Sequence, residues 1–150
     1  MVADMFEIFD NGGHEMISRH GIKRKLGKEI FIYPFQISRL KGVGYNLAVG
    51  DYAWSLISKR PMVTDGEGVE KGFWVEPNET ALVLTKEVVA VSKRIGGTFH
   101  SKVDRVSEGF SSISTTLDPG WIGPLLIAMG AALLGRLQDH RMLMRQATYW

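Results

Sequence analysis

The feature that most limits the fold of this chain is a succession of short β-branched and aromatic runs between residues 30 and 130. Glycine, proline and asparagine separate the runs about every 8 to 12 residues, a spacing typical of sandwiches and barrels. The strongest runs are residues 30–35, 45–54, 73–77, 80–91 and 125–129. Strands do not alternate with long helical patterns, so a parallel βαβ sheet is not indicated. We therefore predict an all-β fold.

Several runs carry a glycine or proline that predicts a local feature. Residues 45–54 read as one strand with a bulge or bend at Gly50. Residues 80–91 predict either a strand pair or one long bent strand, and residues 61–72 have the composition of a long surface loop. Gly96 and Gly97 allow a bulge or a close backbone approach. Residues 111–117 are β-branched and rich in hydroxyl groups, as expected of another strand.

The two ends of the chain differ in residue pattern from the β-rich region between them. In residues 1–29, apolar positions 5–9 and the basic stretch 16–26 suggest short helices or loops. Residues 131–150 contain no proline and no glycine after Gly135, so their propensity is helical. A length of 150 residues suits one domain. We divide it into an N-terminal arm (1–29), a β core (30–130) and an atypical tail (131–150), with short helical segments near both termini.

Composition excludes several classes of function. The formal net charge is +2, which gives no polycationic signal for nucleic acid or for an anionic membrane surface. There is no cysteine, and the four histidines show no metal-ligand spacing, so we predict no protein-bound metal site. The acidic N-terminus is unlike a secretory signal, and we expect a cytoplasmic protein that neither enters a membrane nor binds nucleic acid.

Ser101, Lys102 and Arg105 are candidate anion ligands. A guanidinium presents a fork of donors that fits a phosphate, and the hydroxyl and ammonium groups would add one donor and one point charge. The alternative is that all three are solvated residues on a strand-to-helix connection.

Asp118 begins the turn Asp-Pro-Gly-Trp that ends the hydroxyl-rich run. Its carboxylate could act as a general base toward water or bind a sugar hydroxyl. Alternatively it only caps the turn, as Asp often does at the first turn position. Trp121 offers a face on which a base could stack, and Gly123 follows it closely; tryptophans at such positions also pack into cores or subunit interfaces.

Five segments in fixed order resemble a known family: 33–35, 44–51, 75–87, Ser101 with Arg105, and 118–123. The most specific parts are Ala-Leu-x-x-Thr-x-Glu at 81–87 and Asp-Pro-Gly-Trp-Ile-Gly at 118–123. Together they resemble the dCTP deaminase branch of the dUTPase superfamily over about residues 30 to 130. The resemblance implies a distorted jelly-roll barrel of the dUTPase-like type that assembles as a homotrimer. It also implies sites between neighbouring subunits that bind a deoxypyrimidine triphosphate, with Mg²⁺ carried by the triphosphate.

By the same resemblance, Ser101 and Arg105 would contact phosphate, and Asp118 would lie near the sugar and orient the attacking water. Trp121 and Gly123 would belong to the base and sugar pocket. Two positions depart from the family pattern. Ala128 stands where the deaminases have the glutamate that activates water, and Lys102 replaces the second of two phosphate-facing serines. The connection after Arg105 is also longer than in the family, and the likeness ends after Met129, where the family continues to a mobile arm.

Three hypotheses follow from these features. The first is hydrolysis of dUTP to dUMP and pyrophosphate, with Asp118 as the catalytic residue. The second is dCTP deamination, for which Glu108 would have to replace the missing glutamate. The third is a catalytically inactive trimeric protein that binds nucleotides or other partners. Ala128 places hydrolysis ahead of deamination, because an alanine cannot move a proton.

Overall fold

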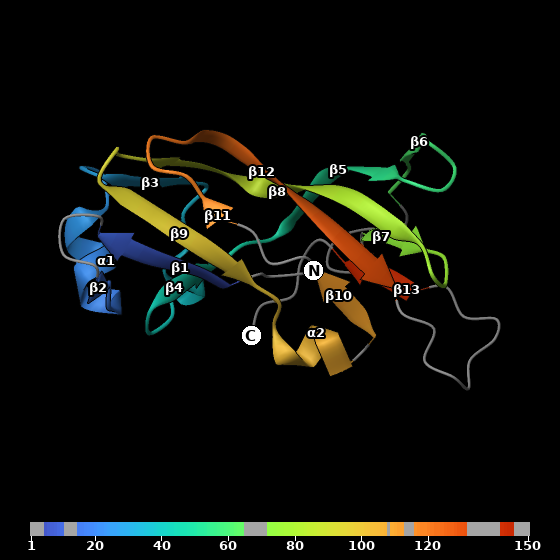
Figure 1. Cartoon of the computed structure of the whole chain (residues 1–150), viewed down its shortest axis with the longest axis horizontal. Helices are drawn as coiled ribbons and strands as arrows, with labels where there is room; N and C mark the ends of the chain where they lie inside the picture. The colour runs from blue at the N-terminus through green and yellow to red at the C-terminus, as the bar shows by residue number, and fades with distance from the viewer. Residues whose placement is uncertain are drawn as a thin grey trace.

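The computed structural model describes residues 5–10, 15–64, 72–107, 109–112, 116–131 and 142–145. Most of these residues lie in β-strands, and the helices are short, so the predicted all-β class is confirmed. The elements in chain order are β1 (Met5–Asp10), β2 (Glu15–Met16), α1 (Arg19–Lys25), β3 (Ile30–Tyr33), the 3₁₀ helix η1 (Ile37–Arg39), β4 (Gly44–Asn46), β5 (Val49–Ser55), β6 (Arg60–Met62), β7 (Gly72–Val75), β8 (Thr80–Val91), β9 (Ile95–His100), α2 (Val103–Ser107), β10 (Phe110–Ser112), β11 (Thr116–Leu117), β12 (Ile122–Ala131) and β13 (Met142–Arg145) (Figure 1).

The strands form three antiparallel sheets. A five-stranded sheet has the order β11-β9-β1-β2, with β4 also paired to β1. A six-stranded sheet has the order β10-β12-β8-β5-β6, with β3 also paired to β8. The remaining two-stranded sheet is β13-β7. Strand β8 pairs with β3, β5 and β12, so it is the central element of the largest sheet. The jelly-roll arrangement stays a prediction.

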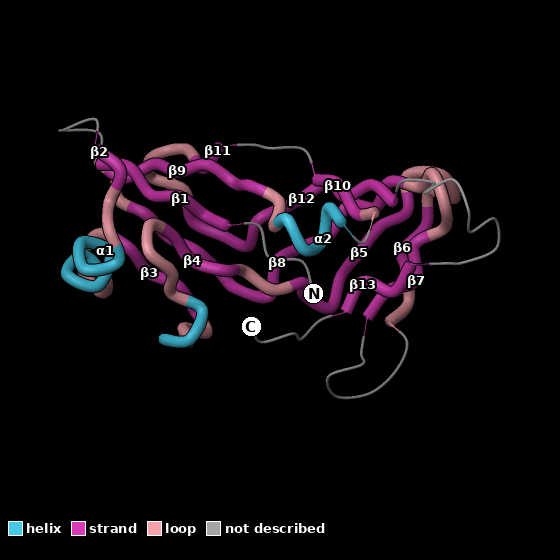
Figure 2. The backbone as a smooth tube through the Cα atoms, turned by 90° about the horizontal axis from the view of Figure 1, so that it is seen from below, coloured by secondary structure: helices cyan, strands magenta, loops and turns pink. Residues whose placement is uncertain are grey.

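Two apolar clusters form the core. The first contains residues of α1, β3, β4 and β9 and the second half of β8, among them Ile22, Tyr45 and Phe99. The second contains residues of β5, β7 and β12 and the first half of β8, among them Phe73 and Met129. The clusters occupy the two ends of the molecule, with α1 and β3 at one end and β6, β7 and β13 at the other (Figure 2). Side chains of β8 alternate between core and exterior, as a strand with period two requires.

The N-terminal arm is partly strand rather than helix. Residues 5–9, predicted as a short helix or a loop, lie in β1, which pairs with β9 from Met5↔His100 to Asp10↔Ile95. The prediction failed because strand pairing with a partner distant in sequence outweighs a weak local periodicity. Of the two alternatives predicted for the basic stretch 16–26, helix or loop, the structure has the helix α1: the Gly21 N–H donates to Ser18 Oγ at 3.3 Å, and Ile22 is buried.

The helical prediction for the tail is wrong for Met142–Arg145. These residues form β13 and pair with β7, from Met142↔Val75 to Arg145↔Gly72. Helix propensities of ordinary residues differ by less than about 0.7 kcal/mol each, so tertiary pairing can override them. Residues 132–141 and 146–150 lie outside the described part of the chain.

The run at 45–54 is not one strand. It divides into β4, in the five-stranded sheet, and β5, in the six-stranded sheet. The predicted irregularity at Gly50 is confirmed, because the register of β5 and β8 shifts between Val49 and Ala53. A Cβ atom at Gly50 would lie 2.8 Å from the Leu84 carbonyl oxygen. The chain therefore crosses between the two sheets here, and glycine lets β5 approach the β8 backbone.

The other local predictions have mixed outcomes. Residues 80–91 form one long strand, β8, and Gly96 closely approaches the backbone at the Leu117 carbonyl. The predicted strand at 111–117 is replaced by β10 and β11, with residues 113–115 outside the described part. The predicted surface loop begins with β6, and its residues 65–71 also lie outside the described part.

Candidate functional site

The predicted turn at Asp118 is present. The Trp121 N–H donates to the Asp118 carbonyl at 3.1 Å, and Gly120 at the third position has a φ of 83°. This φ lies in the left-handed region, which glycine adopts without a steric penalty. The Gly120 N–H donates to the Ser92 carbonyl at 3.1 Å and so fixes the turn against the β8–β9 connection. The carboxylate of Asp118 is exposed to solvent on this fixed turn.

Trp121 and Gly123 belong to the same unit as Asp118. The Trp121 Nε1–H donates to the Gly123 carbonyl at 3.2 Å, and a Cβ at Gly123 would lie 3.8 Å from the indole ring. The Trp121 side chain is 40% exposed, so within this chain it is not a core residue. The turn therefore carries an exposed carboxylate and a partly exposed indole ring three residues apart.

Ser101 and Lys102 directly follow strand β9, and both are partly exposed. Arg105 lies in the short helix α2, so the three predicted anion ligands do occupy a strand-to-helix connection. The Arg105 side chain lies outside the described atoms. The backbone thus places the three residues within one short segment.

The structure does not bring the two groups of predicted residues together. Strand β11 pairs with β9 as Thr116↔Thr98 and Leu117↔Gly97, so the chain at Asp118 continues away from Ser101. From Gly97 to Ser101 the strand advances about 13 Å at roughly 3.3 Å per residue. Figure 1 shows β11 beside β9, with α2 following the other end of β9. No single phosphate or sugar group can contact both Asp118 and Ser101 of one chain.

A row of polar side chains connects these two groups along the five-stranded sheet. Strand β9 buries Phe99 and turns Thr98 and His100 outward, and Thr116 is exposed opposite Thr98. The Thr98 hydroxyl lies 3.0 Å from His100 Nε2, within hydrogen-bond distance. We call Thr116, Thr98 and His100 the polar strip. Thr98 and His100 were not predicted from the sequence, although the alternation around Phe99 indicates that both side chains point outward.

Ala128 lies on the side of the six-stranded sheet that faces away from the core. Directly paired residues share a face in an antiparallel sheet, and Ala128 pairs with Leu82, which pairs with Trp54. Leu126, two residues before Ala128, is 56% exposed. We call this side the outer face; its apolar side chains are those of Phe31, Tyr33, Trp54, Leu82, Leu84, Val88, Ala90, Ile122, Pro124, Leu126 and Ala128, and Lys86 lies among them.

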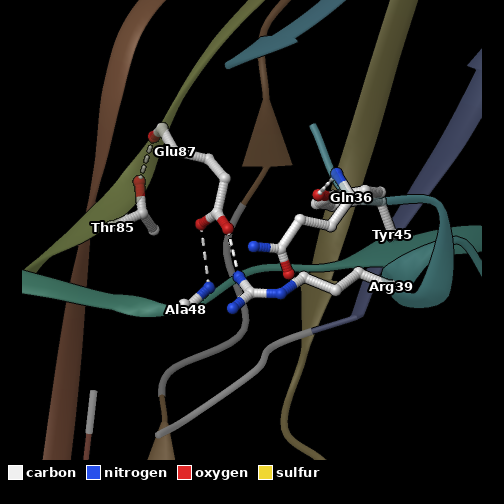
Figure 3. Close-up of polar contacts among 6 residues, drawn as sticks. All are labelled: Gln36, Arg39, Tyr45, Ala48, Thr85 and Glu87. Atoms are coloured by element: carbon white, nitrogen blue, oxygen red, sulfur yellow. Dashed lines mark hydrogen bonds and ion pairs between the residues drawn. The ribbon is translucent and has the colours of Figure 1, made fainter. Parts of the chain in front are cut away.

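Among the described residues, the most buried polar side chain is the carboxylate of Glu87, which ends the Ala-Leu-x-x-Thr-x-Glu segment but was given no role from the sequence. Glu87 is fully buried; its Oε1 accepts from Arg39 Nη1, and its Oε2 accepts from the Ala48 N–H at 2.8 Å (Figure 3). Burial raises the pKa of Glu87, and the Ala48 hydrogen bond and the Arg39 charge oppose that rise. The cluster joins η1, the link between β4 and β5, and β8, so its evident role is structural.

Tyr45 extends this cluster. Its hydroxyl accepts from the Gln36 N–H at 2.9 Å, and its ring stacks on Phe35 with centroids 5.4 Å apart. Burial is the main cause that raises the pKa of Tyr45. These contacts hold the segment between β3 and β4 in place, and none of them involves Asp118 or Ser101.

The remaining features of the described residues do not indicate a second candidate site. Within the described ranges, no group of three or more His, Cys, Asp or Glu side chains could hold a metal ion. In the same part of the chain, no helix is both long and apolar enough to cross a membrane. A groove of about 520 Å³ along β3 and the second half of β8 is lined by apolar residues such as Phe31, Tyr33 and Phe35, and it contains none of the predicted site residues.

Comparison with known proteins identifies similar sequences. No protein-family model matches the chain. The dCTP deaminase of Thermococcus kodakarensis is 34% identical over 105 residues, which are 70% of this chain and 64% of that protein. The dCTP deaminases of Pyrococcus horikoshii and Pyrococcus abyssi are each 32% identical over 105 residues, again 70% of this chain, and 64% and 65% of those proteins. The chain thus matches somewhat less than two thirds of the length of these relatives. These similarities, together with the all-β structure, place the chain in the dCTP deaminase/dUTPase-type superfamily.

Proposed function

We propose that this chain acts in deoxypyrimidine nucleotide metabolism and hydrolyses dUTP to dUMP and pyrophosphate. The similarity to dCTP deaminases supports a deoxypyrimidine nucleotide as the ligand. Asp118, exposed on a fixed turn beside Trp121, is suited to orient the attacking water near the sugar. Ser101, Lys102 and Arg105 bind the phosphates, and Trp121 and Gly123 line the base and sugar pocket.

The environment of Ala128 is the observation that favours hydrolysis over deamination. Deamination requires a group that moves a proton at the base, and the methyl group of alanine cannot do so. The neighbours of Ala128 on the outer face are the apolar side chains of Leu82, Leu126 and Trp54, so none of these three supplies a carboxylate. Glu108, the substitute considered from the sequence, lies outside the described residues.

The proposed site is completed between the subunits of a homotrimer. The separation of Asp118 from Ser101 along β9 supports this arrangement, because the phosphate and sugar ligands of one site then come from different chains. The apolar outer face supplies a surface for subunit packing. Mg²⁺ enters with the triphosphate as part of the substrate and neutralises phosphate charge.

The test compares wild type with Asp118→Asn and Ala128→Glu in assays of pyrophosphate and ammonia release from dUTP and dCTP with Mg²⁺. We expect wild type to release pyrophosphate from dUTP, and Asp118→Asn to lower that rate by about 10²-fold or more, as removal of a general base does. Equal rates in wild type and Asp118→Asn would refute the role of Asp118. Ala128→Glu supplies an acid at position 128, and we expect it to raise ammonia release from dCTP above the wild-type background, provided that sedimentation shows the same assembly as wild type. No ammonia from a folded Ala128→Glu variant that still binds dCTP would contradict the assignment of position 128.

A second candidate is a catalytically inactive trimeric nucleotide-binding or interaction protein. Ala128 favours it, since the residue that the deaminase reaction needs is missing. Calorimetry distinguishes the two: binding of dUTP or dCTP without release of pyrophosphate or ammonia supports the inactive protein.

A further inference from the structure

We propose that the apolar groove along β3 binds an extended, acidic peptide segment of a partner protein. The interaction goes beyond the proposed function, because the groove contains none of the predicted nucleotide ligands. It would use the main chain of β3, aromatic side chains of the outer face and two lysines at the ends of the groove.

The groove presents a continuous apolar surface to solvent. None of the residues that line it carries a charge. Phe31 is 50% exposed and Tyr33 is 79% exposed, and Val88, which pairs with Tyr33, is also exposed. Aromatic side chains contribute strongly to binding when a partner covers them. A contiguous patch of this kind indicates an interaction site more than single exposed residues do.

The free edge of β3 indicates that the occupant is an extended peptide. In the described part of the chain, the edge away from β8 is paired only at Ile30, by the bridge to Leu26 and by the Gly27 N–H, which donates to the Ile30 carbonyl at 2.9 Å. Main-chain groups alternate in direction along a strand, so the N–H and C=O of Ile32 also point away from β8. Ile32 lines the groove although its side chain belongs to the first core cluster. A peptide strand can therefore add to β3 beside Ile32.

Lysines at the two ends of the groove favour an acidic partner. Lys28 lies at one end, in the connection between α1 and β3, and Lys86 lies at the other, on the outer face two positions before Val88; both are exposed. Neither makes an ion pair within the described ranges. The neighbouring carboxylate, Glu29, is already paired with a lysine of α1. Carboxylates near both ends of a peptide would thus meet available cations.

A nucleic-acid strand is the less favoured occupant. It could contact the lysines and stack on the aromatic rings, but it has no peptide groups that continue the β3 ladder at Ile32. The net charge of +2 also supplies little of the phosphate neutralisation on which nucleic-acid binding depends.

The experiment measures fluorescence anisotropy with a labelled probe peptide, Asp-Glu-Val-Thr-Val-Thr-Val-Glu-Asp, whose valines share one face of a strand and whose acids lie at both ends. One control peptide has lysine in place of every acid, and a second has proline in place of the central valine, which removes a main-chain donor. We expect the full-length wild type to bind the acidic peptide at micromolar concentration and to bind both control peptides at least about tenfold more weakly.

Two variants test the residues of the groove. Lys28→Glu should weaken binding about fivefold, as expected for an exposed ion pair, and Phe31→Ser should weaken it about tenfold. Lys59→Glu and Val63→Ser are the matched controls, because both positions are exposed and flank β6 at the other end of the molecule (Figure 2). We expect less than a twofold change in either control. Matching thermal melting curves would confirm that the variants fold.

Four outcomes would overturn the proposal. The first is no binding of the acidic peptide at about 1 mM, and the second is equal binding of the lysine peptide. The third is a loss of assembly mass in Phe31→Ser but not in Val63→Ser, which would show that a second copy of the chain covers the groove. The fourth is tighter binding of oligothymidylate than of the peptide, lost in Phe31→Ser, which would identify a nucleic-acid surface. Pyrophosphate release from dUTP is measured separately, so none of these outcomes decides the proposed function.

Discussion

At the scale of single residues, the interior holds one ionisable pair whose energetics are unusual. Glu87 and Arg39 are both buried, and the carboxylate also accepts from the Ala48 N–H. Removal of one partner of such a pair typically costs about 3 to 5 kcal/mol, because an uncompensated charge stays buried. The pair therefore constrains how η1 and the β4–β5 link lie against β8, whatever its net contribution to stability.

The raised pKa of Glu87 predicts a pH dependence of stability. Because burial favours the neutral acid, the folded protein keeps this proton to a higher pH than the unfolded chain, whose reference value is 4.5. The contribution is complete below pH 4.5 and is lost as pH rises through the folded pKa. Glu87→Gln stays neutral, so its unfolding free energy should improve relative to wild type as pH rises, by at most about 1.4 kcal/mol per pH unit. Urea unfolding measured from pH 4.5 upward checks this, with the exposed Glu76→Gln as control. A constant difference between Glu87→Gln and wild type would contradict the prediction.

Gly50 is a residue-scale constraint imposed by the backbone of another strand. A Cβ at this position would lie 2.8 Å from the Leu84 carbonyl oxygen and 3.0 Å from the Thr85 carbonyl oxygen. We expect Gly50→Ala to lower the unfolding free energy by about 1 to 3 kcal/mol, as overpacking does. Gly42→Ala is the matched control, since a Cβ there meets nothing within 4 Å. Chemical denaturation of both variants measures the difference, and an equal stability of the two would show that β5 can shift without cost.

At the scale of elements, the β8–β12 ladder contains one irregularity that a side chain stabilises. Its register shifts between Pro124 and Leu126. Thr85 Oγ1 accepts from the Leu125 N–H at 2.9 Å and donates to the Glu87 carbonyl at 2.7 Å. The buried hydroxyl thus replaces a ladder partner at the bulge, and it joins the irregularity to the strand segment that carries Glu87.

The role of this hydroxyl can be tested with two substitutions at the same position. Thr85→Val keeps the shape of the side chain but leaves the buried Leu125 N–H without its acceptor, which should cost about 1 to 3 kcal/mol. Thr85→Ser keeps the hydroxyl and loses only a methyl group, so its cost should be smaller, at about 1 kcal/mol. Urea unfolding compares the two. A greater loss in Thr85→Ser than in Thr85→Val would show that packing, and not the hydrogen bonds, dominates at this bulge.

At the scale of the whole molecule, the two halves of the proposed site lie at different ends of β9, and the outer face of the six-stranded sheet is apolar. Contiguous exposed apolar surface on a protein of this kind commonly marks an interaction site. The outer face is a surface suited to subunit packing, and a site shared between chains would take the Asp118 turn from one chain and the Ser101 segment from another. The proposed homotrimer would account for both the separated halves of the site and the exposed apolar outer face.

Disruption of the outer face should change the mass of the assembly. Wild type should sediment at three times the chain mass of 16.7 kDa. Leu126→Glu places a charge in the centre of this face and should shift the population toward monomer, because burial of an unpaired charge is costly. Val63→Glu, at a position that is 85% exposed and not part of the outer face, is the control. A trimer that persists in Leu126→Glu, or a wild-type monomer at micromolar concentration, would contradict packing through this face.

The sequence by itself determined the features that depend on neighbouring residues. The β-branched runs predicted most strands, Asp-Pro-Gly-Trp predicted the turn at Asp118, and the basic stretch 16–26, predicted as helix or loop, contains α1. These features follow from local sterics and local hydrogen bonds. Residues 5–9, predicted as helix or loop, and residues 142–145, predicted as helical, lie in strands, since they pair with distant segments such as β9 and β7.

Only the tertiary structure decided which residues lie together. The separation of Asp118 from Ser101, the polar strip with His100, and the burial of Glu87 against Arg39 all depend on strand register and sheet packing between distant segments. A local pattern cannot specify these partners, because each contact joins residues far apart in the chain or depends on which face of a strand is buried. The sequence therefore identified the chemical groups of the site, and the fold decided which of them one chain can bring together.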